Sequence, residues 1–222
     1  MEMIEKSTLK FLKDLDANND RDWFISHKPD FERANANLVE FVGYLIGEIA
    51  KFDEAIYGLD PRACVFRIYR DVRFSKDKRP YKNNLGAYLS LGGRKSMHPG
   101  YYFHIQPGQC FIAGGKHMPD GPETLKIRTA IADKTDEFLK IVEKKSFHEQ
   151  LGEMRGNRLK SAPKGFDAGH KAVEYLKLKE FMGFKELHDD KFLTSAEFPK
   201  FLVGTMKAMY PLVNFLRNSL SQ

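Results

Sequence analysis

Residues 100–115 read GYYFHIQPGQCFIAGG, and this stretch decides the fold class. Gly100 to Gln106 and Cys110 to Gly114 are short apolar runs rich in residues that favour strands, and Pro107-Gly108 between them marks a turn. The stretch therefore predicts a β-hairpin. Leu85 to Leu91 is a run of the same kind and predicts a further strand of the same antiparallel sheet.

Two runs farther from the hairpin also predict strands. Val65 to Tyr69 places Arg67 and Tyr69 on one face and its apolar residues on the other, since successive side chains of a strand point to opposite faces. Late in the chain, Lys177 and Lys179 alternate with apolar residues, which fits a strand with one charged face. The four runs between Val65 and Gly114 together predict a sheet of four or more strands.

Helical patterns precede and follow the sheet. Pro29 suits the first turn of a long helix, and the apolar stripe that follows has the helical period of about 3.6 residues. Further helices are predicted from Pro122, from Thr135 and from near Ser195, with Pro211 kinking or interrupting the last one. The stripe of the long helix consists of Leu38, Phe41, Val42, Leu45, Ile46 and Ile49.

Helices at both ends of the chain with a sheet between them predict an α+β fold. We expect a central antiparallel β-sheet of four or more strands, over about residues 64–115, packed by N-terminal and C-terminal helices. No repeat or linker separates parts of the sequence. We therefore expect one domain, 1–222, with a helical part at 1–55, a sheet core at 60–118 and a helical part at 122–220.

The composition fits a folded protein, since 42% of the 222 residues are hydrophobic and 30% are charged. A chain of this length buries roughly 70% of its unfolded surface, so it needs no metal or disulfide to fold. The N-terminal residues lack the apolar segment of a signal peptide, and no run approaches the roughly 20 apolar residues of a membrane helix. We expect a cytoplasmic protein with no membrane partner, in which Cys64 and Cys110 are buried free thiols.

Arginine and lysine gather in one segment, residues 67–82. The segment holds seven bases and two acids, a local excess of five positive charges, whereas the whole chain has a formal net charge of +6. Such local basicity differs from that of a protein that coats nucleic acid. The seven bases are Arg67, Arg70, Arg73, Lys76, Lys78, Arg79 and Lys82.

The same segment carries a family resemblance. Residues 66–82 read FRIYRDVRFSKDKRPYK, with NNDRDWF at 18–24, GYYFHIQPG at 100–108 and RLKSAPKGF at 158–166. In these motifs the chain resembles the bacterial proteins grouped as domain of unknown function 2461, over nearly its whole length. The resemblance implies no established activity and no catalytic residue. The family hallmark, R-x-x-R-D-x-R-F followed by D-K and a tyrosine, falls here on Arg67, Arg70, Asp71, Arg73, Phe74, Asp77, Lys78 and Tyr81.

The arginines of the segment predict an anion site. Guanidinium groups this close in sequence repel one another unless anions lie among them, and each offers a planar fork of donors that suits carboxylate or phosphate. We therefore predict a pocket in which Arg67, Arg70 and Arg73 bind a small phosphorylated or carboxylated ligand, with Lys78 assisting.

Three residues are candidates for catalysis, and whether the protein is an enzyme stays open. Asp71 would orient the arginines or act as a base. His104 suits a general acid or base at neutral pH, because its unperturbed pKa is about 6.5. Tyr81 would be a hydroxyl donor. A half-buried histidine bonded to backbone and a tyrosine that only packs are the alternatives.

Two other functions stay open. A nucleic acid is an alternative partner, because Tyr69, Phe74 and Tyr81 are aromatic side chains within the basic run that would stack on unpaired bases. Alternatively, the arginines are architectural and pair with aspartates such as Asp71 and Asp77, while the protein works through a partner surface. The substrate and the oligomeric state do not follow from the sequence.

No metal and no cofactor is predicted. The histidines do not occur at HxH or HExxH spacing, and two cysteines are too few for a zinc site. Gly114-Gly115-Lys116 lacks the rest of the G-x-x-x-x-G-K-[ST] phosphate loop. A G-x-S-x-G elbow and a dinucleotide-binding fingerprint are also missing from the sequence.

Overall fold

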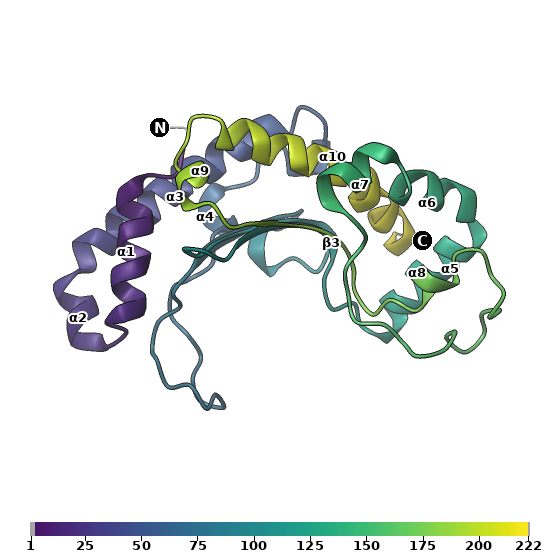
Figure 1. The fold of residues 1–222 in the computed structure, drawn as a ribbon, viewed down its shortest axis with the longest axis horizontal. Helices are drawn as coiled ribbons and strands as arrows, with labels where there is room; N and C mark the ends of the chain where they lie inside the picture. The colour runs from purple at the N-terminus through teal and green to yellow at the C-terminus, as the bar shows by residue number, and fades with distance from the viewer. Residues whose placement is uncertain (1–2, 222) are drawn as a thin grey trace. The chain divides into compact units, whose positions relative to one another are not determined.

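The four strands found among the described residues form one antiparallel sheet flanked by helices, which confirms the α+β fold (Figure 1). The computed structural model describes residues 3–221. The strand order is β1-β2-β3-β4, and the predicted hairpin is the β2–β3 pair. The strands are β1 (Leu85–Leu89), β2 (Gly100–Ile105), β3 (Cys110–Lys116) and β4 (Phe181–Leu187).

The strand predicted at Val65 to Tyr69 is wrong. This segment makes only two isolated antiparallel bridges, Val65 with Ala87 and Tyr69 with Tyr81. From one bridge to the other there are four residue steps from Val65 to Tyr69 but six from Tyr81 to Ala87. Because the two counts differ, a continuous ladder of paired residues cannot keep its register. Residues 66–84, between Val65 and β1, form an arm that extends from the sheet on the side opposite α3 (Lys28–Ile49) (Figure 1).

The strand predicted around Lys177 and Lys179 lies farther along the chain, since β4 begins only at Phe181. Val173–Leu176 is a short helix, α8, and Leu178 makes an isolated bridge with Arg158. Gly115 explains the position of β4. Its φ is +137°, and a Cβ there would lie 2.1 Å from the carbonyl oxygen of Phe181. The backbones of β3 and β4 therefore approach at a position where only glycine fits.

The chain forms two compact units. Unit 1 holds the chain up to Ser96, with Tyr102–Ile112 and Glu186–Val203. Unit 2 holds Met97–Tyr101, Ala113–Lys185 and the chain from Gly204. The interpretation of the chain as a single domain stays a prediction.

Helix α3 provides the core of unit 1. Its predicted apolar stripe is buried, and the ring of Phe41 contacts the rings of Phe103 and Phe198 at centroid distances of 5.9 and 6.0 Å. The other elements of this unit are α1 (Lys6–Ala17), α2 (Arg21–Ser26), α4 (Pro61–Cys64), α9 (Asp190–Leu193), the start of α10 (Phe198–Leu220) and the 3₁₀ turns η1 (Glu54–Ile56) and η2 (Gly93–Lys95).

Unit 2 packs helices around an aromatic contact and a buried ion pair. The ring centroids of Phe138 and Phe215 lie 5.3 Å apart. Lys116 is buried, and its ammonium lies 2.6 Å from a carboxylate oxygen of Glu123, which also completes the capping box of α5 with Asp120. The helices are α5 (Gly121–Asp133), α6 (Thr135–Val142), α7 (Lys145–Leu151), α8 and the rest of α10.

Pro211 does not interrupt the last helix, contrary to one of the two predicted outcomes. Helix α10 runs from Phe198 to Leu220 with Pro211 inside it. Pro211 is exposed and has no N–H. At this position of a helix, an N–H would donate a hydrogen bond to the carbonyl of Lys207, one turn toward the N-terminus. The lost hydrogen bond thus lies on an exposed face of the helix, where water can replace it.

Strand β2 alternates between two environments. Tyr101, Phe103 and Ile105 are buried, whereas Tyr102 and His104 between them are half-buried. This follows from the two-residue period of a strand. One face of β2 therefore belongs to the core, and the other presents a tyrosine and a histidine side by side.

We predict that Gly114→Ala destabilises the protein by about 1–3 kcal/mol, the usual range for overpacking a core. A Cβ at Gly114 would lie 2.7 Å from Met209 Sδ and 2.9 Å from its Cβ, and atoms this near the Met209 backbone cannot move aside easily. Urea unfolding monitored by circular dichroism measures the change. Gly47→Ala is the control, since nothing lies within 4 Å of that helical glycine; it should stabilise by up to about 1 kcal/mol. Equal stability of Gly114→Ala and wild type would contradict the packing described.

Candidate functional site

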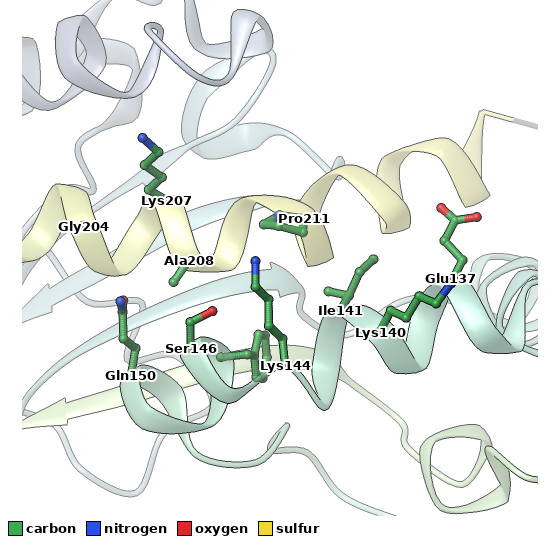
Figure 2. A pocket seen from close by; sticks show the side chains of 11 residues that line it. Glu137, Lys140, Ile141, Lys144, Ser146, Gln150, Gly204, Lys207, Ala208 and Pro211 are labelled. Atoms are coloured by element: carbon green, nitrogen blue, oxygen red, sulfur yellow. The ribbon is translucent and has the colours of Figure 1, made fainter.

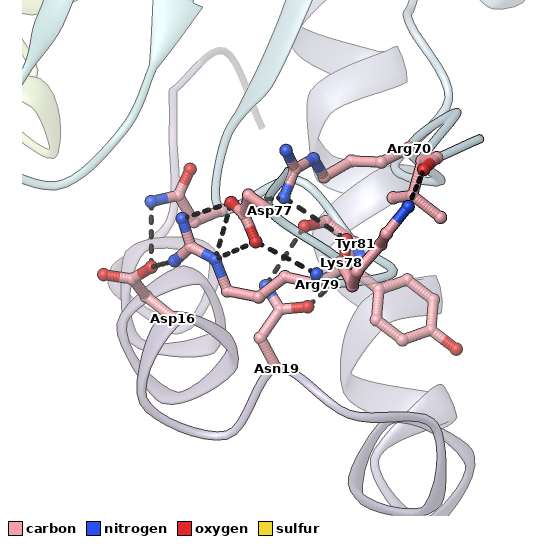
Figure 3. A network of polar contacts seen from close by, with 9 residues as sticks. Asp16, Asn19, Arg70, Asp77, Lys78, Arg79 and Tyr81 are labelled. Atoms are coloured by element: carbon pink, nitrogen blue, oxygen red, sulfur yellow. Dashed lines mark hydrogen bonds and ion pairs between the residues drawn. The ribbon is translucent and has the colours of Figure 1, made fainter. Parts of the chain in front are cut away.

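Asp77 binds two arginines of the arm together (Figure 3). Its Oδ2 lies 2.6 Å from Arg70 Nη1 and 2.9 Å from Arg79 Nη2. The hydrogen bonds from Arg79, followed by that from Arg70, hold the pKa of Asp77 well below its usual range. Arg79 also reaches Asp16 of α1, with 3.2 Å between Nη1 and Oδ1. This network ties the arm to the first helix.

Asn19 holds the end of the arm through two backbone hydrogen bonds. Its side-chain amide donates to the Tyr81 carbonyl, and its side-chain oxygen accepts from the Tyr81 N–H, each at 3.1 Å. The Tyr81 ring is buried and stacks on Phe24 at a centroid distance of 3.9 Å. Burial raises the pKa of the Tyr81 hydroxyl. Figure 3 shows this ring pointing away from the charged network.

Asp71 and Arg73 neutralise each other. Arg73 Nε lies 2.9 Å from Asp71 Oδ1, and Arg73 Nη2 lies 2.6 Å from Asp71 Oδ2. This bidentate contact lowers the pKa of Asp71, so the carboxylate stays ionised and is a weak base. Lys78 donates to the Val72 carbonyl at 3.1 Å and so closes the loop. These three predicted site residues therefore make contacts within the arm.

Arg67 and Lys82 have no acidic partner among residues 3–221. Arg67 is exposed, whereas Lys82 is half-buried with its ammonium 5.6 Å from the centroid of the Phe66 ring. Burial, and after it the charge of Arg67, lowers the pKa of Lys82. The two bases thus lie within electrostatic range of each other without a compensating carboxylate.

His104 lies in the same electrostatic environment. Its Nε2 is 3.1 Å from Gln106 Oε1, and its Nδ1 is 3.0 Å from the Tyr102 hydroxyl. Gln106 Nε2 donates to Gln109, which turns Oε1 toward the imidazole; His104 Nε2 must then carry the proton, and Nδ1 accepts from Tyr102. Burial, together with the charge of Lys82, lowers the pKa of His104 despite the Gln106 bond. The ring is therefore neutral at pH 7.

Tyr102 lies over a glycine of the neighbouring strand. A Cβ at Gly86 would lie only 2.8 Å from the Tyr102 hydroxyl oxygen, so the missing side chain makes room for that hydroxyl. The Tyr102 ring contacts Phe66 and Phe111 at centroid distances of 5.9 and 5.5 Å. Burial raises the pKa of Tyr102 to about 12, so the hydroxyl keeps its proton.

We call Arg67, Lys82, Tyr102 and His104 the sheet-face cluster. Of the predicted site residues, Arg67 and His104 belong to it, because Lys82 interacts electrostatically with both. Lys82 was recognised in the sequence as one of seven bases but was not assigned to the site. Its distinguishing property is that it is half-buried without an acidic partner among the described residues, and that property depends on the fold. The other predicted site residues, Arg70, Asp71, Arg73, Lys78 and Tyr81, make the separate contacts described above.

Other kinds of site receive no support within the part of the chain that the structure describes. No group of three His, Cys, Asp or Glu side chains has the arrangement of a metal site. No described helix combines the length and the apolar character needed to cross a bilayer. Cys64 and Cys110 are free and buried, as predicted, and burial raises the pKa of each thiol to about 11.

Comparison with known proteins places the chain in a family without assigning it an activity. A family model described as conserved hypothetical protein, DUF2461, matches residues 7–215. The chain belongs to this family. The match covers the whole arm and all four members of the sheet-face cluster, and the description names no reaction or ligand. No curated protein and no solved structure matches the chain.

The pKa of His104 predicts a pH dependence of stability. Because the folded state lowers this pKa below the unfolded value of about 6.5, the unfolded chain binds the proton more readily. Stability should therefore be fully present above about pH 6.5 and fall as the pH drops below it. The free energy of unfolding, measured with denaturant from about pH 7.5 to about pH 5, should fall less for His104→Asn than for wild type. His188→Asn, at an exposed histidine, is the control substitution. A His104→Asn slope equal to that of wild type would contradict this prediction.

The Asp77 network predicts that Arg70 contributes more to stability than Arg73. The Arg70 side chain is 24% exposed, and that of Arg73 is 75% exposed. Arg70→Ala should lower the melting temperature by several degrees, because Asp77 loses a half-buried partner and the Arg79 carbonyl loses a donor. Arg73→Ala should change it little, since exposed ion pairs contribute little. Differential scanning calorimetry of both variants measures this, and equal melting temperatures would contradict it.

Proposed function

We propose that this protein binds a small phosphorylated or carboxylated anion at the sheet-face cluster. One observation carries the proposal. Of the bases of the arm without an acidic partner among the described residues, which also include Lys76 and Lys78, Lys82 is the half-buried one, and the charge of Arg67 acts on it. Arg70, Arg73 and Arg79 are each paired with an aspartate. Two cations that interact electrostatically and have no counter-charge favour the binding of an anion.

Arg67 and Lys82 would make different contacts with the anion. Arg67 offers the planar fork of donors that matches two oxygens of a carboxylate or phosphate. Lys82 offers a point charge, and its partial burial strengthens an electrostatic contact because water screens it less. Burial, and after it the charge of Arg67, lowers the pKa of Lys82, and a bound anion would oppose both effects, so binding and charging of Lys82 would favour each other.

His104 and Tyr102 would respond to the anion. The neutral imidazole accepts a hydrogen bond from the Tyr102 hydroxyl, so this hydroxyl has no proton left to donate to a ligand. A nearby anion would favour protonation of His104, and the new Nδ1–H would donate to the Tyr102 oxygen. The Tyr102 hydroxyl would then be free to donate to the ligand. Binding coupled in this way takes up a proton and strengthens as the pH falls through the pKa of His104.

The proposal concerns binding and not catalysis. The three residues predicted as catalytic nevertheless differ in how well they could act as a general acid or base. His104 is the best placed, since it belongs to the same cluster as the proposed ligand-binding bases. Asp71 has both oxygens bonded to Arg73, and the Tyr81 ring is covered by Phe24. A general acid or base at this site would therefore be His104.

A single-stranded nucleic acid is the second candidate partner, and Phe74 is the observation that favours it. Phe74 lies in the arm and is 96% exposed, with the guanidinium of Arg73 5.9 Å from the ring centroid. An exposed aromatic ring among bases can stack on a nucleobase. Tyr81 offers no such surface because it is buried.

We further propose a cytoplasmic location. The two free, buried cysteines support it, since a reducing compartment keeps thiols unpaired.

A thermal-shift experiment tests anion binding. Wild type, Arg67→Ala and Lys82→Met are compared with inorganic phosphate, sugar phosphates, nucleotides and citrate at matched ionic strength; Met keeps the apolar stem of Lys82 over Phe66. A ligand at about 100 times its Kd should raise the melting temperature of the wild type by about 5–10 °C, because it stabilises by about 2.7 kcal/mol. Both variants should lose this shift, and the wild-type shift should grow from about pH 7.5 to about pH 6.

Lys76→Ala is the matched control, since Lys76 is an exposed base of the same segment with no acidic partner among residues 3–221. It should keep the wild-type shift. Equal losses in all three variants would indicate nonspecific charge, and no shift with any anion would reject the proposal. A shift confined to oligonucleotides, lost in Phe74→Ala and falling steeply with salt, would favour the nucleic-acid candidate instead.

A further inference from the structure

Unit 2 contains a groove of about 830 Å³, separate from the sheet-face cluster (Figure 2). Its walls are α6, the start of α7 and the part of α10 between Gly204 and Pro211. The volume lies in the range of sites that take small organic molecules. Eleven residues line it: Glu137, Lys140, Ile141, Lys144, Ser146, Phe147, Gln150, Gly204, Lys207, Ala208 and Pro211.

The floor of the groove is apolar. Ile141 and Phe147 contribute from α6 and α7, and Ala208 and Pro211 contribute from α10. Helix α10 buries Met209 and Leu212 on its opposite face, so the groove face carries only small or partly exposed residues. Such a floor can take an apolar chain or ring without moving the core.

The charge of the groove is positive. Three lysines line it, against one acid, Glu137. None of these lysines (Lys140, Lys144 and Lys207) forms an ion pair among the described residues. The ammonium of the neighbouring Lys145, in contrast, lies 3.6 Å from a carboxylate oxygen of Glu149. Figure 2 shows the Lys144 side chain rising from the start of α7 toward α10, over the apolar floor. Lys144 is therefore the cation best placed to meet a ligand in the groove. The groove thus combines an apolar floor with an ammonium directed over it.

We propose that this groove binds a small amphipathic monoanion, in particular a medium-chain carboxylate, with the acid group at Lys144 and the chain on the floor formed by Ile141, Ala208 and Pro211. Each half of such a ligand meets its complement, since lysine binds the carboxylate as a point charge and the apolar residues exclude water from the chain. The groove lies wholly in unit 2, so this proposal does not depend on the anion site of unit 1.

Octanoate is the test ligand, with acetate and octanol as probes of its two halves. Isothermal titration calorimetry of the full chain should show saturable binding of one octanoate and much weaker binding of acetate and octanol. Lys144→Gln should raise the Kd about tenfold, which corresponds to about 1.4 kcal/mol. Lys145→Gln is the matched control, one residue away and outside the lining, and its Kd should stay within about twofold of wild type.

Ala208→Phe provides a second, charge-independent test, because the larger ring would fill the floor. It should abolish octanoate binding while circular dichroism shows a folded protein, and NMR methyl shifts of Ile141 and Ala208 should respond to octanoate in the wild type. Equal affinity for octanol would reject the role of Lys144. Equal effects of Lys144→Gln and Lys145→Gln, or unchanged binding by Ala208→Phe, would place octanoate elsewhere and overturn the proposal.

Discussion

Strand β2 can bury only every second side chain, and much of unit 1 depends on this constraint. Phe103 and Ile105 point to the helices, where Phe103 meets Phe41 of α3. Tyr102 and His104 must then point to the opposite face. The packing that builds the core thus presents a tyrosine and a histidine next to the arm that carries Lys82, and half-burial there makes the histidine neutral.

The bases of the arm have two different physical roles. Asp77 gathers Arg70 and Arg79, and Arg79 in turn reaches Asp16, so these charges hold the loop against α1. Arg67 and Lys82 remain without an acid among the described residues. The architectural interpretation of the arginines and the anion-binding one are therefore compatible, because they concern different members of the same basic segment.

The two proposed sites differ in chemistry. The sheet-face cluster combines an arginine with polar groups that can rearrange their protons, which suits an anion with several oxygens. The groove of unit 2 has lysines over an apolar floor and suits an anion with an apolar chain. Each site draws its residues from a single unit, so either can be tested without changing the other.

The sequence by itself determined the α+β class, the β2–β3 hairpin, the apolar face of α3 and the family, because each depends on local periodicity, turn residues or a contiguous motif. It also identified the basic segment and two members of the sheet-face cluster, Arg67 and His104. Tertiary structure decided the rest. The link between the arm and α1 depends on Asp16, which lies far from Arg79 in sequence, and the start of β4 depends on the close approach of Phe181 to Gly115. Both are contacts between distant segments, which local patterns do not encode.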